Sequence, residues 1–76
     1  MNTYRIEVTD TFGGESNYSW VRRYEFTAKS DLAAVRKAKG LAGWGGIHCE
    51  REDHGDQIVL RPRGICQIMF IDYVVE

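Results

Sequence analysis

The sequence predicts an α+β fold in which a single antiparallel β-sheet carries one helix packed on one face, in the order β-β-α-β-β-β. Three observations support this class: strand-length segments with alternating apolar and polar residues, one segment with helical periodicity, and turn residues between the segments. A chain of 76 residues is long enough for one core only. We therefore expect residues 1–76 to form a single α+β domain without a deep cleft between domains.

The strongest strand signal is the last segment, residues 65–75, which follows the turn residues Pro62 and Gly64. It is rich in β-branched and aromatic residues and contains no Gly or Pro. Both faces of its alternation are apolar: Cys66, Ile68, Phe70 and Val74 lie on one, and Ile65, Met69, Ile71, Tyr73 and Val75 on the other. A strand of this kind is usually covered on both faces, so we expect a central strand, or a sheet whose second face meets another chain.

Two further strands are predicted at residues 3–9 and 18–28, because both segments alternate in the manner of half-buried strands. The residues between them, 10–17, are rich in Gly, Asp, Ser and Asn and predict a long hairpin loop. In the second strand, Arg22 falls on the same face as the aromatic residues Trp20, Tyr24 and Phe26. Either the strand leaves the core at Arg22, or a bulge shifts the register there.

The helix is predicted to begin after Ser30, a favourable N-cap, and to end at Gly40 or Gly43. Its expected apolar face consists of Leu32, Val35, Ala38 and Ala42, and we expect Leu41 and Trp44 to close the core below it. The remaining strands are predicted at residues 47–51 and 57–61, on either side of an acidic turn at residues 52–56.

Charge is distributed unevenly along the chain, although the net charge is only −1. Residues 20–40 hold six cations and two acids, whereas the segments before and after are acidic. Such polarity steers a charged partner without defining its identity. The predicted partner-binding residues are a basic set, Arg22, Arg23, Arg36, Lys37 and Lys39, and an acidic set, Glu50, Glu52, Asp53 and Asp56.

The basic segment at residues 22–39, with Tyr18, Trp20 and Tyr24 near its start, has the cations and aromatic residues of a nucleic-acid surface. The alternative is that the aromatic residues belong to the core and the cations solvate the helix. We favour this alternative, because the pI of about 6.1 is low for a nucleic-acid-binding domain.

Neither metal binding nor catalysis is predicted. His48, Cys49, His54 and Cys66 are ligand types for zinc, but paired spacings such as C-x-x-C are missing. The neighbours His48 and Cys49 point to opposite faces of a strand, while a pairing of His54 with Cys66 stays open. We expect no cofactor, no enzymatic activity, and free thiols at Cys49 and Cys66, since one cysteine pair without an export signal rarely forms a bridge. A bridge would require their strands to be neighbours.

Two features bear on location. No apolar run approaches the roughly 20 residues that span a membrane, and residues 1–5 lack a secretory hydrophobic region. We therefore expect a soluble protein of the cytoplasm.

Two segments resemble small proteins encoded by bacteriophages and prophages. They are DTFGGESNYSWVRR, at residues 10–23, and the stretch at residues 55–70 that holds Gly55, Asp56, Gly64, Cys66, Met69 and Phe70. The resemblance covers most of the chain and carries no catalytic motif. It implies a mobile-element protein in a bacterial host. By analogy of size, layout and origin, it also suggests an inhibitor of a host defence system, similar to the anti-CRISPR proteins.

We therefore expect a non-enzymatic protein that binds a bacterial host protein or complex. We expect it either to bind an acidic surface of the partner through its basic set, or to occupy a basic nucleic-acid-binding channel of the partner with its acidic set. Two alternatives stay open: a nucleic-acid-binding accessory protein, and a homodimeric assembly protein. The expected oligomer face is Met69, Ile71 and Tyr73, unless a curled sheet hides these residues within the monomer.

Overall fold

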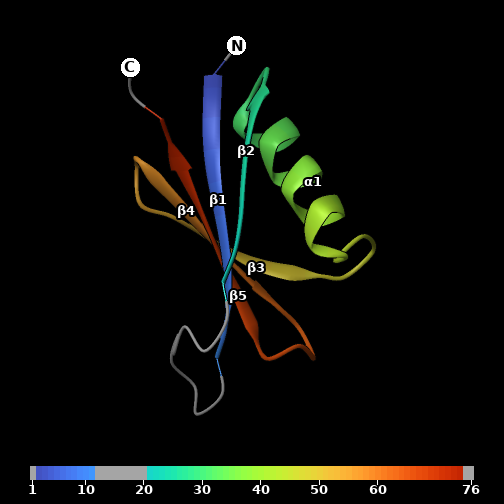
Figure 1. Cartoon of the computed structure of the whole chain (residues 1–76). Coiled ribbons are helices and arrows are strands. Elements are labelled where there is room, and N and C mark those ends of the chain that lie inside the picture. Colours follow the sequence, from blue (N-terminus) through green and yellow to red (C-terminus); the bar gives the residue numbers. More distant parts are fainter. Residues whose placement is uncertain (1, 12–20, 75–76) are drawn as a thin grey trace.

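The computed structural model describes residues 2–11 and 21–74 and arranges them as one helix on one face of a β-sheet (Figure 1). The elements are β1 (Asn2–Asp10), β2 (Val21–Ala28), α1 (Asp31–Ala42), β3 (Cys49–Asp53), β4 (Gln57–Pro62) and β5 (Gln67–Tyr73). The strands form one antiparallel sheet in the order β2-β1-β5-β4-β3. The predicted α+β class and element order are confirmed. The predicted loop at residues 12–17 and the predictions for Tyr18, Trp20 and Val75 lie outside the described residues.

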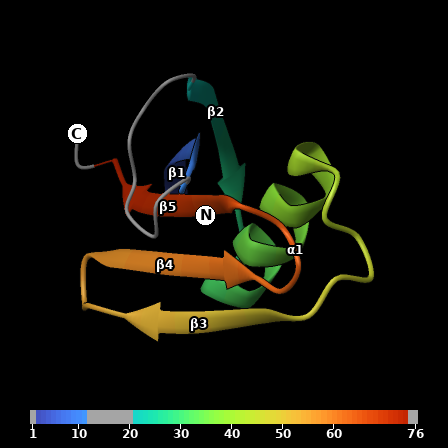
Figure 2. The ribbon, with the colours of Figure 1, turned by 90° about the horizontal axis from the view of Figure 1, so that it is seen from below.

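The last strand, β5, is the central strand of the sheet, as its two apolar faces predicted, although it begins at Gln67 rather than at residue 65. It pairs with β1 on one side and with β4 on the other, so Ile71 lies between Ile6 and Ile58. In the same way Met69 lies beside the β1 residue Val8. The two edge strands of this arrangement are β2 and β3, seen at opposite ends of the sheet in Figure 2.

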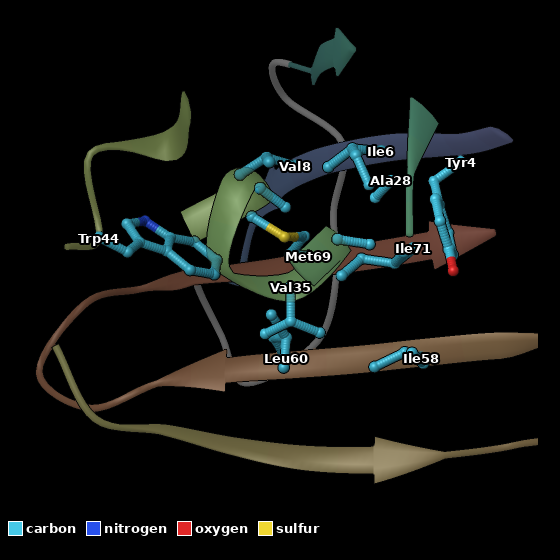
Figure 3. Close-up of a cluster of buried hydrophobic side chains, with 12 residues drawn as sticks. Tyr4, Ile6, Val8, Ala28, Val35, Trp44, Ile58, Leu60, Met69 and Ile71 are labelled. Carbon is cyan, nitrogen blue, oxygen red and sulfur yellow. The ribbon is translucent and has the colours of Figure 1, made fainter. Parts of the chain in front are cut away.

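The core lies between α1 and the sheet face beneath it, which we call the helix face (Figure 3). The buried residues of this cluster are Tyr4, Ile6, Val8, Ala28, Ala34, Val35, Ala38, Trp44, Ile58, Leu60, Met69 and Ile71. The helix supplies only Ala34, Val35 and Ala38 to it. Because these side chains are small, the helix backbone can approach the sheet closely, and most of the buried volume comes from strand residues and Trp44.

Both ends of α1 are capped by the residues that the sequence indicated. The Ser30 hydroxyl accepts a hydrogen bond from the Ala33 N–H at 3.2 Å. At the other end Gly43 adopts the left-handed conformation with φ of 78°, and its N–H donates to the carbonyl of Gly40. The turn delivers Trp44 into the core, where the indole Nε1–H donates to Gln67 Oε1 at 2.8 Å.

Leu32 and Leu41 were both predicted to be core residues, and both predictions are wrong. Their side chains are 54% and 42% exposed. The arc of the helix that meets the sheet is centred on Ala34, Val35 and Ala38, and at about 100° per residue Leu32 and Leu41 flank this arc on opposite sides. Trp44 alone closes the lower end of the core as expected.

Arg22 lies on the helix face of β2 without a bulge. The register between β1 and β2 is continuous from the Asn2–Ala28 pair to the Thr9–Val21 pair. Arg22 is exposed at the far end of that register. The first of the two predicted explanations therefore holds: the strand leaves the core there.

The sheet face away from α1, here called the second face, has an apolar strip of its own. Val59 and Ile68 are 4% and 2% exposed, and Phe70, which pairs with Val59, is half-buried. These residues are absent from the cluster under the helix. Thus β5 is apolar on both faces, and its two faces contact different surroundings.

Substituting Ala38 with Leu should destabilise the fold, since the larger side chain would separate α1 from the sheet. We expect the free energy of unfolding to fall by about 1–3 kcal/mol, measured by denaturant unfolding. The matched control is Arg36→Leu at an exposed position of the same helix, which should change it by no more than about 0.5 kcal/mol. Equal losses in the two variants would show that the contact is not tight.

Candidate interaction surfaces

Four cations lie on α1 or just before it, and we call them the basic helix surface: Lys29, Arg36, Lys37 and Lys39. At about 100° per residue, Lys37 and Lys39 lie on opposite flanks of the helix, with Arg36 on the outer side between them. Lys29, Arg36 and Lys37 are exposed, and Lys39 is half-buried. Among the described residues, none of the four forms an ion pair. Lys37 Nζ lies 5.0 Å from the centroid of the Phe26 ring, a cation–π contact between α1 and β2.

The structure divides the predicted basic set. Arg22 and Arg23 are consecutive in β2 and therefore lie on opposite faces of the sheet. Arg22 is on the helix face, two residues from Tyr24 on the same strand. The Tyr24 hydroxyl donates to the Leu41 carbonyl at 3.5 Å, so Arg22 lies toward the C-terminal end of α1. Arg23 is on the second face, where its Nε is 3.3 Å from Glu7 Oε2.

The predicted acidic set lies along β3 and the turn that follows it, at the edge of the sheet (Figure 2). All four acids, Glu50, Glu52, Asp53 and Asp56, are exposed. Two of them are already paired with side chains of the same hairpin. Glu52 contacts His54 Nε2 at 3.2 Å and Arg61 Nε at 3.3 Å, while Asp53 contacts Arg51 at 3.2 Å. The hydrogen bond from His54, followed by that from Arg61, lowers the pKa of the Glu52 carboxyl.

The predicted oligomer face is wrong in its placement. Met69 and Ile71 are 0% and 1% exposed and lie under α1 with Tyr73, which packs partly buried against the same cluster. The face of β5 turned away from the helix carries Ile68, Phe70 and Asp72 instead. The competing interpretation, that the monomer hides Met69 and Ile71, is correct, although the helix rather than a curled sheet covers them.

Sequence reasoning missed a polar cluster in which two tyrosines share one carboxylate. The Tyr4 hydroxyl donates to Asp31 Oδ1 at 2.9 Å, and the Tyr73 hydroxyl donates to the same oxygen. The two rings pack with centroids 5.1 Å apart. The cluster joins the first turn of α1 to β1 and β5. Its sequence signal was an acid directly after the N-cap together with one Tyr on the apolar face of each strand.

The hydrogen bonds set the protonation of this cluster. Donation from Tyr73, and then from Tyr4, lowers the pKa of the Asp31 carboxyl. The bond to Asp31, with burial, raises the pKa of Tyr73 well above its usual 10. Burial, followed by Asp31, raises the pKa of Tyr4 despite the opposing contact with Asn2. Near neutral pH the carboxylate is therefore charged and both phenols are neutral, which suits an anchoring role rather than proton transfer.

The residue types with nucleophilic or metal-binding chemistry do not converge. Cys49 and Cys66 are free thiols, and their segments flank β4 rather than neighbouring each other. His54 and Cys66 lie beyond opposite ends of β4, so the pairing that the sequence left open is not formed. Across residues 2–11 and 21–74, no three His, Cys, Asp or Glu side chains are arranged to hold a metal ion.

Comparisons of the chain with protein-family models, with curated proteins and with solved structures gave no match. Within the described part of the chain, α1 is too short and too polar to cross a membrane. The interpretation of the surfaces therefore depends on their own geometry and charge.

The tyrosine–aspartate cluster should contribute to stability. Asp31→Asn and Tyr73→Phe should each lower the free energy of unfolding at pH 7 by about 1 kcal/mol, since each removes a charge-assisted hydrogen bond that is only half-buried. The control is Tyr24→Phe, whose hydroxyl makes only a long contact to a carbonyl. An equal loss in this control would show that the shared carboxylate has no special importance.

The same cluster predicts a pH dependence with a definite sign. The lowered pKa of Asp31 gives stability that is present at neutral pH and lost as the pH falls below about 4. The raised pKa of Tyr73 gives stability that is lost as the pH rises above about 10. Denaturant unfolding across pH should therefore show a smaller acid loss in Asp31→Asn and a smaller alkaline loss in Tyr73→Phe than in the wild type. Parallel profiles for all three proteins would contradict this.

Proposed function

We propose that this chain is a non-enzymatic binding protein whose basic helix surface docks on an acidic surface of a protein partner. The observation that carries the proposal is the difference in pairing between the two sets of charges. None of the cations of the basic helix surface forms an ion pair among the described residues, whereas Glu52 and Asp53, two of the four acids of the other set, form ion pairs within their own hairpin. Charges without an internal ion pair are available to a charged ligand, and complementary charge accelerates and orients association.

The aromatic residues next to these cations favour a protein over a nucleic acid. Base stacking needs an exposed ring face. Phe26 is covered by Lys37, and Tyr24 is half-buried against the core and directed toward Leu41. Among the described residues of the segment, Tyr24 and Phe26 thus offer no open platform for stacking, whereas Tyr18 and Trp20 lie outside the described residues. We infer that a basic helix of this kind suits a carboxylate-rich protein surface better than single-stranded bases.

The resemblance to small phage-encoded proteins supplies the setting for this proposal. The partner would be a protein or complex of a bacterial host, and inhibition of a defence complex, as by anti-CRISPR proteins, is one form that such binding takes.

Charge reversal on the two surfaces tests the proposal. Affinity-tagged protein is incubated with a bacterial lysate, captured proteins are identified, and the affinity for each purified candidate is measured by calorimetry. The variant Arg36→Glu with Lys37→Glu should weaken binding by about tenfold or more, since repulsion replaces two attractive contacts. The matched control is Glu50→Lys with Asp56→Lys, an equal and opposite change on exposed sites of the other surface, which should leave the affinity within about twofold.

Two outcomes would contradict the proposal. If the control variant loses binding and the helix variant does not, the acidic set is the binding surface. If purified DNA or RNA binds instead, with affinity that falls steeply as salt is raised, the basic helix surface serves nucleic acid.

A further inference from the structure

The edge strand β2 lacks features that normally prevent edge-to-edge association, whereas the other edge strand, β3, has them. Strand β2 is eight residues long, contains no Pro or Gly, and pairs with β1 without a bulge. The opposite edge, β3, has five residues, four of them charged and exposed. Short, charged edges resist pairing with another sheet, and long regular edges favour it.

The charges of β2 are self-complementary in one antiparallel register only. When two copies form one continuous sheet about a two-fold axis, residue i of one copy lies opposite residue j of the other, and the sum i + j is the same for every pair. This sum must be even, because only then do both helices lie on the same side of the joined sheet. Centring the axis on Tyr24 places Arg23 of each copy opposite Glu25 of the other. Centring it on Arg23 or on Glu25 places like charges opposite each other, which is unfavourable.

The neighbouring strand extends this complementarity. On the second face Arg5 pairs with Glu25 at 3.6 Å, and Glu7 pairs with Arg23 at 3.3 Å. In the Tyr24-centred register, each row across four strands would read Arg5, Glu25, Arg23 and Glu7, with the last two residues from the second copy. Neighbouring side chains in this row then always carry opposite charges. No other centre within β2 gives this alternation.

The helix side of the same register brings apolar surface together. Tyr24 of one copy lies opposite Tyr24 of the other, and Leu41, 42% exposed, lies beside Tyr24 through the hydrogen bond to its carbonyl. The exposed Leu41 side chain, which the monomer leaves in water, would therefore lie near the two-fold axis. By contrast, β3 centred on Arg51 would place Glu50 opposite Glu52, a repulsive pair.

We propose that the chain forms a homodimer in which the β2 strands of two copies pair antiparallel about Tyr24, joining two five-stranded sheets into one. This goes beyond the proposed function, because it concerns assembly of the chain with itself and is tested on purified protein without a partner. It also replaces the face of Met69 and Ile71 as the site of self-association.

Charge variants and their mixture test the pairing. Sedimentation equilibrium should show a dimer for the wild type at about 100 µM, the weak range expected of a small interface. Glu25→Arg alone and Arg23→Glu alone should each raise the dissociation constant by about tenfold or more. Mixed in equal amounts, the two variants should recover the dimer, because each Arg then faces a Glu. The matched control, Arg63→Glu, makes the same charge change at an exposed site between β4 and β5, away from the β2 edge, and should remain dimeric.

A cross-link tests the register independently. In a background of Cys49→Ser and Cys66→Ser, Tyr24→Cys should form a disulfide-linked dimer on mild oxidation, since opposite residues of an antiparallel pair have Cα atoms about 4.5–5.5 Å apart, within disulfide range. Thr27→Cys, exposed and three positions from the axis, should not, because its two copies would be about 20 Å apart. Circular dichroism confirms that each variant is folded.

Three results would overturn the inference. The first is a wild-type monomer throughout the concentration range. The second is failure of the two folded charge variants to associate with each other. The third is a cross-link at position 27 in preference to position 24, which would place the contact elsewhere.

Discussion

The fold depends on the close approach of one short helix to the central strands of a five-stranded sheet. Ala34, Val35 and Ala38 leave room for large strand residues such as Met69 and Ile71, which fill the space between the two layers. A single helix of 12 residues covers this face, so nearly all of its buried area must be well packed. The capping by Ser30 and Gly43 and the anchoring of Asp31 by two tyrosines all serve to hold this one helix in place.

The charged side chains of this architecture lie mainly on its exterior. The polar cluster of Tyr4, Asp31 and Tyr73 uses its hydrogen bonds to join helix and sheet. The charges are divided between the layers. In the part of the chain that the structure describes, Lys29, Arg36, Lys37 and Lys39 form no ion pair, while the second face carries the pairs Arg5–Glu25, Arg23–Glu7 and Arg61–Glu52. One layer is therefore suited to attract an acidic partner, and the edge of the other is suited to meet a copy of itself.

The sequence was sufficient for the features that depend on local pattern, namely the fold class, the central position of β5 and the capped helix. The sequence was insufficient where two structural arrangements are compatible with the same pattern of apolar and polar residues. Because both faces of β5 are apolar, alternation could not show that the helix covers Met69 rather than Ile68. Helical periodicity likewise did not distinguish Leu32 from Ala34 as the core residue, because only packing against the sheet determines which side of α1 is buried. The shared carboxylate requires β1 and β5 to be neighbours, a long-range pairing that local patterns do not reveal.

The position of β5 also determines when the protein can fold. Its residues 67–73 are made after all the other strands, yet they lie between β1 and β4. Until they have left the ribosome, the pair of β1 and β2 with α1 and the pair of β3 and β4 remain two unjoined halves, each with part of its apolar side in water. Folding must therefore follow translation of this segment rather than accompany it, and a nascent chain stalled before residue 67 should be a substrate for chaperones.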